Sequence, residues 1–395
     1  MDESGKSVES SANTPEHQAL AREAAGEAIV LLKNKGNTLP LKKDSIRSLA
    51  VIGPNAAEAR IEGGGSSCVK PYYMVSPLDG LRQYCGDSIK VSYELGCQIN
   101  RNTLSLKADY LTPAPADLME RAVKAAASAD VALVFVGTSE EWETEGFDRE
   151  SMELPGQQAK LIERIAEANK KTIVVLNNGS PVAMERWLGK VVGVVEAWFP
   201  GQECGNAIAE VLFGTINPSG KLPVTFPRRL EDNPTFINYP GENGKVLYGE
   251  GIFVGYRYYD AKKVEPLFPF GYGLSYTSFQ YSNLEVSQSE MTADDQLAVT
   301  IEIKNTGKRT GQEVIQLYIH DVDSSLARPP KELKDFRKVF LKPGEMKKVS
   351  FTLDKRSLSF YDPDKKQWMA EPGEFDVLVG SSSRDIRSTA SFKLK

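Results

Sequence analysis

Four short apolar runs constrain the fold of the first 230 residues more than any other feature of the sequence. The runs occupy residues 49–52, 131–136, 172–176 and 191–197, and glycine, asparagine or proline follows each one closely. Each run is too short for a free-standing helix and apolar enough to be buried on both faces, as a parallel strand is. Segments with helical spacing lie between the runs, so the pattern predicts an open, mostly parallel sheet covered by helices on both faces.

The helices of this α/β region are expected where apolar residues recur at helical spacing. These segments are residues 16–34, 116–127, 156–168 and 203–213. Residues 222–226 are expected to add an edge strand, because Pro223 would be poorly tolerated in a central one.

The pattern changes after about residue 230. Residues 231–275 are dense in Gly, Pro and Tyr. The part over 241–275 is expected to pack across both domains, because its aromatic side chains would be costly to leave exposed to water. From Tyr276 onward apolar residues alternate with polar ones between turn signals, which predicts about seven short strands in a β-sandwich. The expected division is a disordered or linker head over 1–16, an α/β sandwich over 17–240, a linker over 241–275 and a β-sandwich over 276–395.

Composition narrows the chemistry that the chain can perform. Lys and Arg number 48 against 53 Asp and Glu, and this net charge of −5 argues against a nucleic-acid partner held by a basic surface. No apolar run approaches the roughly 18–20 residues of a membrane span, and the first residues lack the order of a signal peptide. The four cysteines (Cys68, Cys85, Cys97, Cys204) form no CxxC pair, which argues against a zinc site; free buried thiols are preferred, with disulfides left open. With only two histidines, carboxylates are the expected acid–base groups.

The densest chemical cluster occupies residues 140–150, with sequence EEWETEGFDRE. It follows the run at 131–136, at the strand's carboxyl end, where open α/β sheets place their ligand sites. Carboxylates beside aromatic rings suit glycoside chemistry, because a ring stacks on a sugar and partial desolvation raises the pKa of a proton-donating carboxyl. A solvated acidic loop is the alternative that composition alone favours.

A glycine-rich segment, GGGSS at 63–67, is the second candidate. It has neither the GxGxxG spacing nor the lysine of a phosphate-binding loop, which argues against a nucleotide. Two interpretations remain open: a flexible turn, or a loop that permits close approach of a sugar or a neighbouring domain.

Seven ordered motifs then carry a resemblance to a known family. They are EAIVLLKNKGNTLPL at 27–41, LAVIGPNA at 49–56, GGGSSCVKPYYMVSPLDGL at 63–81, EWETEGFDRE at 141–150, VLNNGSPVAM at 175–184, AWFPGQECGNAIAEVLFGTINPSGKLPVTFP at 197–227 and PLFPFGYGLSYTSF at 266–279. This series resembles the carboxyl-terminal portion of family 3 glycoside hydrolases, the β-glucosidase family. The final 120 residues resemble that family's fibronectin type III-like domain.

The resemblance implies a retaining mechanism that uses two carboxylates on two domains. Glu145, in the Glu-Gly-aromatic-Asp form of the family's loop, would be the acid/base, with Glu143 as the best alternative. Trp142, Phe147, Asp148 and Arg149 would shape the leaving-group subsite or hold the loop. No metal or cofactor is implied.

The chain departs from the family because it contains no (β/α)8 barrel and no counterpart of the nucleophile motif. The leading hypothesis is therefore the acid/base half of a β-glucosidase-type hydrolase, which acts on a β-glucoside or oligosaccharide when a barrel is supplied in cis or in trans. The chain alone is expected to be inactive. The alternative is a non-catalytic carbohydrate-binding or interaction module left after loss of the barrel. No nucleic-acid or membrane partner is expected, and a secreted or periplasmic location of a longer parent stays open.

Overall fold

The computed structural model describes residues 12–99, 116–146 and 148–395, and the chain divides into two compact units. The first unit comprises the described residues up to Ile29, Lys33–Ser180 and Arg186–Ile216. The second unit comprises Val30–Leu32, Pro181–Glu185 and Asn217–Lys395.

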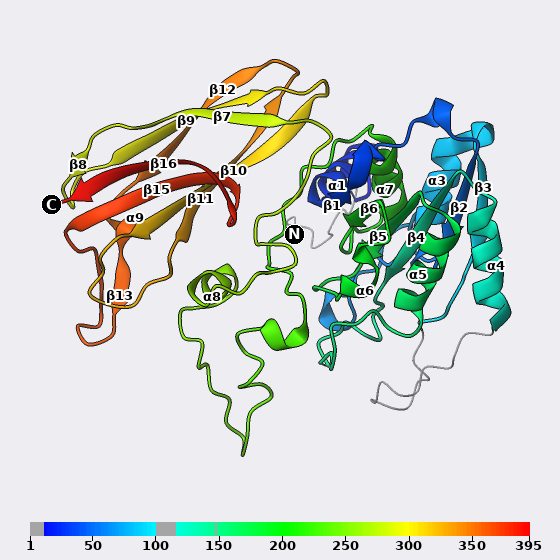
Figure 1. Ribbon diagram of the computed structural model, residues 1–395, viewed down its shortest axis with the longest axis horizontal. Coiled ribbons are helices and arrows are strands. Elements are labelled where there is room, and N and C mark those ends of the chain that lie inside the picture. Colours follow the sequence, from blue (N-terminus) through cyan, green and yellow to red (C-terminus); the bar gives the residue numbers. More distant parts are fainter. Residues whose placement is uncertain (1–11, 100–115, 147) are drawn as a thin grey trace, which may run out of the picture. The chain divides into compact units, whose positions relative to one another are not determined.

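The described residues contain a six-stranded sheet in the order β1-β6-β5-β4-β2-β3, and all of its strands except part of β1 belong to the first unit (Figure 1). Its strands are β1 (Val30–Asn34), β2 (Ser48–Ile52), β3 (Lys90–Glu94), β4 (Val131–Gly137), β5 (Thr172–Asn177) and β6 (Gly193–Glu196). Strands β6, β5, β4, β2 and β3 run parallel, and every residue of β4 and β5 is buried. The expected open, mostly parallel sheet is therefore confirmed.

Helices pack in two groups with the sheet between them (Figure 1). The helices of this region are α1 (Pro15–Ala28), α2 (Pro54–Ala57), α3 (Pro77–Cys85), α4 (Ala116–Ala127), α5 (Gln158–Ala168), α6 (Glu185–Leu188) and α7 (Cys204–Phe213). Helix α7 packs against both α1 and α3, whereas α4 packs against α5. Apolar positions at helical spacing supply the buried face of each; in α5 these include Leu161, Ile162 and Ile165.

The order of strands reverses between β2 and β4, which places the candidate site. The chain leaves β2 through α3 toward β3 at one edge, and it leaves β4 through α5 toward β5 in the opposite direction. Right-handed crossovers put such connections on opposite faces, and open α/β folds place their ligand sites at the carboxyl ends of the strands at such a switch point. In this structure the loops after β2 and β4 meet at that edge of the sheet, where Gly64 bridges to Thr144. The loop after β2 carries the GGGSS segment, and the loop after β4 carries the acidic cluster.

Two predictions about these elements are wrong. The helix expected over 16–34 ends at Ala28, and Val30–Asn34 form the edge strand β1. Backbone pairing decides this, because the apolar side chains suit either element; beyond the strand, Lys35 N donates to Val192 O at 2.7 Å. Residues 222–226 form no regular strand, only an isolated bridge between Phe226 and Phe268. The strand β3 and the helix α3 were not predicted.

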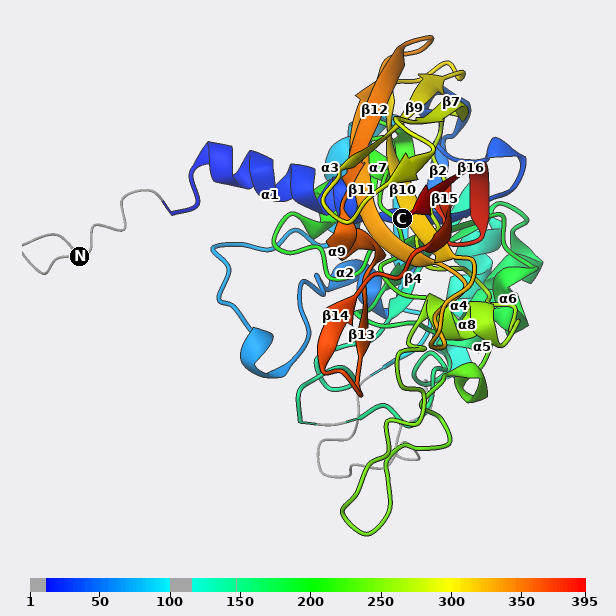
Figure 2. The same ribbon diagram turned by 90° about the vertical axis from the view of Figure 1, so that its left-hand side faces the viewer.

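The second unit contains a β-sandwich, as predicted (Figure 2). One sheet has the order β11-β10-β15-β16-β8, the other β12-β9-β7, and β13 pairs with β14. The elements are α8 (Tyr256–Ala261), β7 (Phe279–Val286), β8 (Glu290–Met291), β9 (Leu297–Asn305), β10 (Gly311–Asp321), β11 (Glu332–Leu341), β12 (Met346–Leu353), α9 (Lys355–Leu358), β13 (Phe360–Asp362), β14 (Gln367–Met369), β15 (Gly373–Ser382) and β16 (Asp385–Leu394). Alternate residues of β9, from Leu297 to Ile303, enter the core that the two sheets share.

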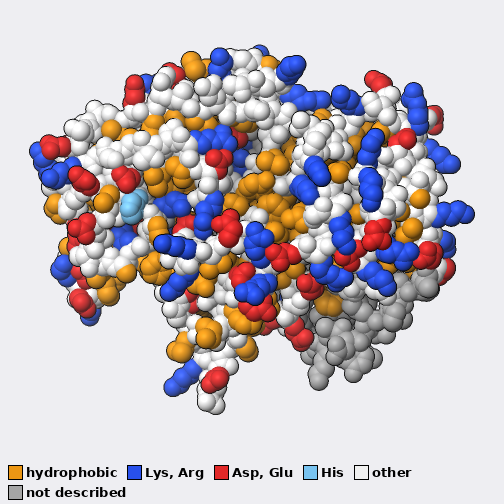
Figure 3. All heavy atoms as spheres, in the orientation of Figure 1, with side chains coloured by type: hydrophobic (Ala, Val, Ile, Leu, Met, Phe, Trp, Pro, Cys, Tyr) orange, Lys and Arg blue, Asp and Glu red, His pale blue; other side chains and the backbone are white. Residues whose placement is uncertain are grey.

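The segment that precedes the β-sandwich is only partly covered. Tyr259 and Phe268 are buried, but residues 236–254, here called the apolar loop, expose most of their large side chains (Figure 3). Tyr248 is 81% exposed, so the prediction that aromatic side chains here are packed away from water is wrong for this loop. The loop makes local turns, such as the one between Glu242 and Lys245, and these leave its apolar side chains facing outward.

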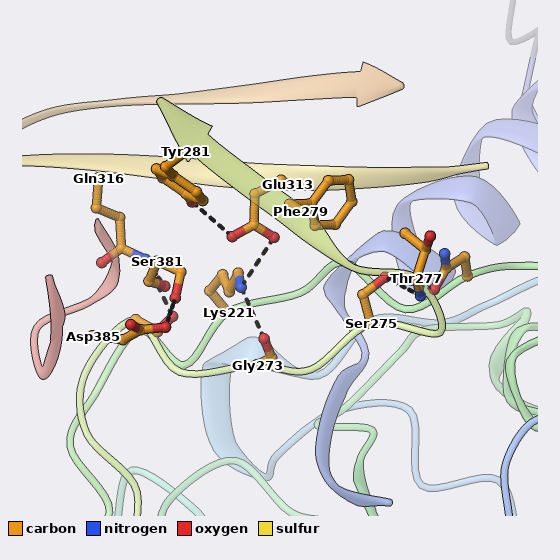
Figure 4. Close-up of polar contacts among 12 residues, drawn as sticks. Lys221, Gly273, Ser275, Thr277, Phe279, Tyr281, Glu313, Gln316, Ser381 and Asp385 are labelled. Carbon is orange, nitrogen blue, oxygen red and sulfur yellow. Dashed lines mark hydrogen bonds and ion pairs between the residues drawn. The ribbon is translucent and has the colours of Figure 1, made fainter. Parts of the chain in front are cut away.

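A buried polar cluster joins the start of the second unit to its β-sandwich (Figure 4). Lys221 Nζ donates to Gly273 O at 2.8 Å and lies 3.5 Å from a carboxylate oxygen of Glu313 on β10. Tyr281 on β7 donates its hydroxyl to the other oxygen of Glu313 at 2.9 Å. Burial raises the pKa of Tyr281 well above its ordinary value, so the phenol stays a donor in this cluster.

Candidate active site

Buried polar side chains connect the loops at the carboxyl end of the sheet. Asn55, Thr138, Asn177, Asn178 and Glu196 follow or end four neighbouring strands, and all five are fully buried. Asn55 Nδ2 donates to Thr138 O at 3.0 Å, which links the loop after β2 to the loop after β4. Asn178 Nδ2 donates to Glu196 Oε2 at 3.2 Å, which links the loop after β5 to the end of β6. These bonds form a buried polar layer at the carboxyl edge of the sheet.

Trp142 fixes the loop after β4 from the inside. Its side chain is buried, and its indole Nε1 donates to Ile99 O at 2.8 Å. The backbone N–H groups of Trp142 and Glu143 both donate to Ser139 O at 2.9 Å, which makes a tight turn. Of the two roles expected for Trp142, this position supports holding the loop.

Glu143 is the most heavily bonded carboxylate of the acidic cluster. Its Oε2 accepts from Thr138 Oγ1 at 2.8 Å and from Gly179 N at 2.5 Å. Its Oε1 accepts from Arg149 Nη1 at 3.0 Å and from the hydroxyl of Ser180. Arg149 also donates to Ser180 Oγ at 2.7 Å, so Arg149 lies inside this network.

The glycine-rich segment packs directly against the acidic loop. Gly64 N donates to Glu143 O at 2.8 Å, and Gly64 forms a parallel bridge with Thr144. A Cβ atom on Gly64 would lie 2.7 Å from Glu140 O and 2.8 Å from Thr144 Oγ1, so a larger residue does not fit. The close approach seen here is to the acidic loop of the same unit, and approach of a sugar or a neighbouring domain stays a prediction.

Glu145 is exposed at the tip of the loop, where it faces the glycine-rich segment. Ser66 donates both its backbone N–H, at 3.1 Å, and its hydroxyl to Glu145 Oε2. These two hydrogen bonds, the hydroxyl first, lower the pKa of Glu145. The expectation of a partly desolvated carboxyl with a raised pKa is therefore wrong for this structure, because Glu145 has donors and solvent around it rather than apolar walls. Asp148 is exposed as well, and Phe147 lies outside the described residues.

Glu196 is a buried carboxyl that the sequence analysis did not single out. Its Oε1 accepts from Trp198 N at 3.0 Å, and burial raises its pKa well above the ordinary value. The sequence feature that could have indicated Glu196 is the presence of an acidic residue inside the apolar run at 191–197, one position before its end. Its place at the end of β6 makes it part of the buried polar layer beneath these loops, whereas Glu145 is exposed.

The remaining observations concern metals, thiols and membranes. Over the described ranges, no group of three or more His, Cys, Asp or Glu side chains is placed to hold a metal ion. All four cysteines are free; Cys85, Cys97 and Cys204 are buried as preferred, whereas Cys68 is exposed. Among the helices that the structure describes, none has the length and apolarity of a membrane span.

These features define a class of protein: an α/β sandwich that presents a carboxylate at the carboxyl edge of its sheet, followed by a β-sandwich. The sequence description of the glycosyl hydrolase family 3 C-terminal domain matches residues 29–276, and that of the fibronectin type III-like domain matches residues 313–383. The chain belongs to glycosyl hydrolase family 3, of which it carries the C-terminal domain and the fibronectin type III-like domain.

Individual relatives agree with this family. The chain is 48% identical over 370 residues to thermostable β-glucosidase B of Acetivibrio thermocellus, covering 94% of this chain and 47% of that protein. It is 40% identical over 385 residues to an exo-α-(1→6)-L-arabinopyranosidase of Bifidobacterium longum, covering 96% of this chain and 49% of that enzyme. The crystal structure of a family 3 β-glucosidase from Bifidobacterium adolescentis superposes with a TM-score of 0.89 at 40% identity, over 100% of this chain and 55% of that one. The chain thus spans about half the length of these relatives.

Proposed function

We propose that this chain supplies the acid/base carboxylate, Glu145, of a retaining β-glucosidase whose nucleophile stands on a (β/α)8 barrel. One observation carries the proposal: Glu145 is an exposed carboxylate at the carboxyl edge of the sheet beside β2 and β4, on a loop that Trp142 and Glu143 hold in place. An exposed group on an anchored loop can reach a glycosidic oxygen bound outside the sheet. The β-glucosidase names of the relatives support β-glucosides as the substrate class.

The reaction would proceed in two balanced steps. In the first, the barrel's carboxylate attacks the anomeric carbon, the C–O bond electrons pass to the glycosidic oxygen, and Glu145 gives that oxygen its proton. In the second, the Glu145 carboxylate takes a proton from water, the water oxygen attacks the anomeric carbon, and the nucleophile leaves as a carboxylate. Retaining enzymes place the two carboxyl groups only about 5–5.5 Å apart, so the barrel must meet this loop closely.

The bonds from Ser66 suit one half of this cycle. They stabilise ionised Glu145, which is the form that acts as base toward water. For the acid half, the carboxyl must hold a proton near neutral pH, which requires exclusion of water or loss of the Ser66 bonds. A barrel and substrate that cover the loop would supply that desolvation.

The first test concerns the chain by itself. Because double displacement needs both carboxylates in register, we expect the chain alone to release no aryl alcohol from aryl β-glucosides above background. Mixing or fusing it with the barrel of a relative such as β-glucosidase B should restore turnover. Turnover by homogeneous chain alone would contradict the requirement for a barrel.

The second test assigns the proton donor in the reconstituted enzyme. Glu145→Ala should slow hydrolysis of poor leaving groups by roughly 10²–10⁴-fold and activated aryl groups far less, because only the former need protonation. Azide should partly restore turnover by attacking the glycosyl-enzyme. Glu150→Ala, which removes an exposed carboxylate of the same cluster, serves as the matched control. Wild-type behaviour of Glu145→Ala together with this pattern in Glu143→Ala would move the assignment to Glu143.

A further inference from the structure

We infer that Glu143 is a positioning residue, whose carboxylate clamps the loop after β4 to the turn after β5 and so sets where Glu145 lies. The catalytic consequence rests on the function proposed above for Glu145. The clamp itself rests on the geometry of the first unit and can be tested without any activity.

The carboxylate of Glu143 is saturated by donors from three segments. Thr138 belongs to the loop that Glu143 itself occupies, Arg149 lies beyond the acidic cluster's tip, and Gly179 and Ser180 belong to the turn after β5. A carboxylate offers about four lone-pair sites, and four donors occupy them here. The side chain of Glu143 is only 11% exposed and that of Arg149 15%, so little water competes for these bonds.

The full set of hydrogen bonds distinguishes the carboxylate of Glu143 from that of Glu145. A group that carries a proton to and from a substrate needs a free lone pair that points outward. The Glu143 oxygens point at protein donors, whereas Glu145 is exposed and, among the described residues, accepts hydrogen bonds from Ser66. The two glutamates therefore have different roles: Glu143 holds the loop, and Glu145 faces solvent.

The turn after β5 is shaped to receive this carboxylate. A Cβ atom on Gly179 would lie 3.0 Å from Glu143 Oε2 and 2.8 Å from Phe199 Cε2, so a larger residue would have to displace these side chains, whereas glycine lets its backbone nitrogen lie 2.5 Å from the oxygen. On the opposite side, Glu143 O accepts from Gly64 N. Side chain and backbone of Glu143 thus connect the turn after β5 with the glycine-rich segment, and Glu145 lies between that segment and solvent.

The clamp is tested first on the isolated chain by hydrogen–deuterium exchange. Glu143→Gln puts an NH₂ group where two donors point, so amides in 138–146 and 178–180 should exchange at least about 10-fold faster. Glu140→Gln removes the same charge from an exposed position of the same loop and should leave these rates unchanged. Amides of β9 and β12 in the second unit report whether the fold is intact. If Glu143→Gln unfolds the first unit, Ser180→Ala, which removes a single donor, should give a smaller increase confined to the same segments.

Unchanged exchange in both Glu143→Gln and Ser180→Ala would overturn the clamp. The catalytic consequence is then read in the reconstituted enzyme, where Glu143→Gln should lower kcat by about 10–100-fold, with a smaller effect on KM, because the proton donor is misplaced rather than removed. Azide should not restore this loss, since the Glu145 carboxylate is still present. Rescue by azide as large as that of Glu145→Ala would show that Glu143 carries the proton and would overturn the positioning role. A Glu145→Ala variant with wild-type activity would instead refute the proposed function and leave the exchange result standing.

Discussion

Replacing Lys221 with methionine tests the buried ion pair of the second unit. The substitution keeps the length of the side chain but removes the ammonium group, which bonds Gly273 O at 2.8 Å and lies 3.5 Å from Glu313. The side chains of Lys221 and Glu313 are 12% and 5% exposed, so water cannot replace the lost partner easily. Glu313 is then a buried carboxylate that keeps the hydrogen bond from Tyr281 and the electrostatic attraction of Arg387.

The magnitude follows from this geometry. Two unit charges 3.5 Å apart attract by about 5 kcal/mol at an effective dielectric constant of 20. The desolvation of the lysine, which the variant no longer suffers, offsets part of that attraction, and the lost bond to Gly273 adds about 1 kcal/mol. We therefore expect the free energy of unfolding to fall by about 3–5 kcal/mol, as in other buried pairs that lose one partner. For a unit of this size that lowers Tm by roughly 6–20 °C.

Differential scanning calorimetry measures this shift. The two units can unfold in separate transitions, so hydrogen exchange at the amides of β10 identifies the transition of the second unit. Lys347→Met is the matched control, because Lys347 pairs with Glu345 at the surface, where its side chain is 44% exposed. A surface pair of this kind contributes about 0–1 kcal/mol.

A loss below about 1 kcal/mol for Lys221→Met would refute the reasoning. It would mean that Glu313 finds water or a new donor once Lys221 is gone. The double variant Lys221→Met/Glu313→Gln gives a second check, because removing both charges should cost less than the sum of the single changes.

Three further predictions address the site and the surface. Ser66→Ala should raise the pKa of Glu145 toward its ordinary value, because the variant loses the hydroxyl that bonds the ionised carboxylate; carboxyl ¹³C chemical shifts measure this pKa. A lowered pKa means that ionised Glu145 stabilises the folded state above the ordinary pKa, and that this stabilisation is lost as the pH falls. Cys68 should be the first thiol to react with a thiol reagent under native conditions, and Cys68→Ser should leave only slow labelling, since burial raises the pKa of the Cys97 and Cys204 thiols to about 12. The apolar loop should bind ANS, and replacing Leu247 and Tyr248 by serine should reduce that fluorescence without lowering Tm; equal fluorescence in the variant would place the binding elsewhere.

Local sequence determined those elements whose pattern suits a strand or a helix but not both. The apolar runs that became β2, β4 and β5 are too short for helices, and the helix expected over 116–127 has the bounds of α4. The run that became β1 was misassigned because its leucines and valine suit a buried helix as well as a buried strand. Only pairing at the edge of the sheet, which depends on residues more than 150 positions away, decides between them.

In the candidate site, too, the sequence determined some features and the tertiary structure decided others. The sequence by itself determined that an acidic loop follows a buried parallel strand, and parallel topology then requires that loop to lie at the ligand-binding edge of the sheet. It did not determine which glutamate is held and which is exposed. Glu143 finds its donors at Gly179 and Ser180, and Glu145 finds Ser66, 79 positions earlier in the chain. Hydrogen bonds between residues so distant in sequence exist only once the sheet has brought the loops after β2, β4 and β5 to one edge, so the tertiary structure alone gave these two neighbouring carboxylates different surroundings.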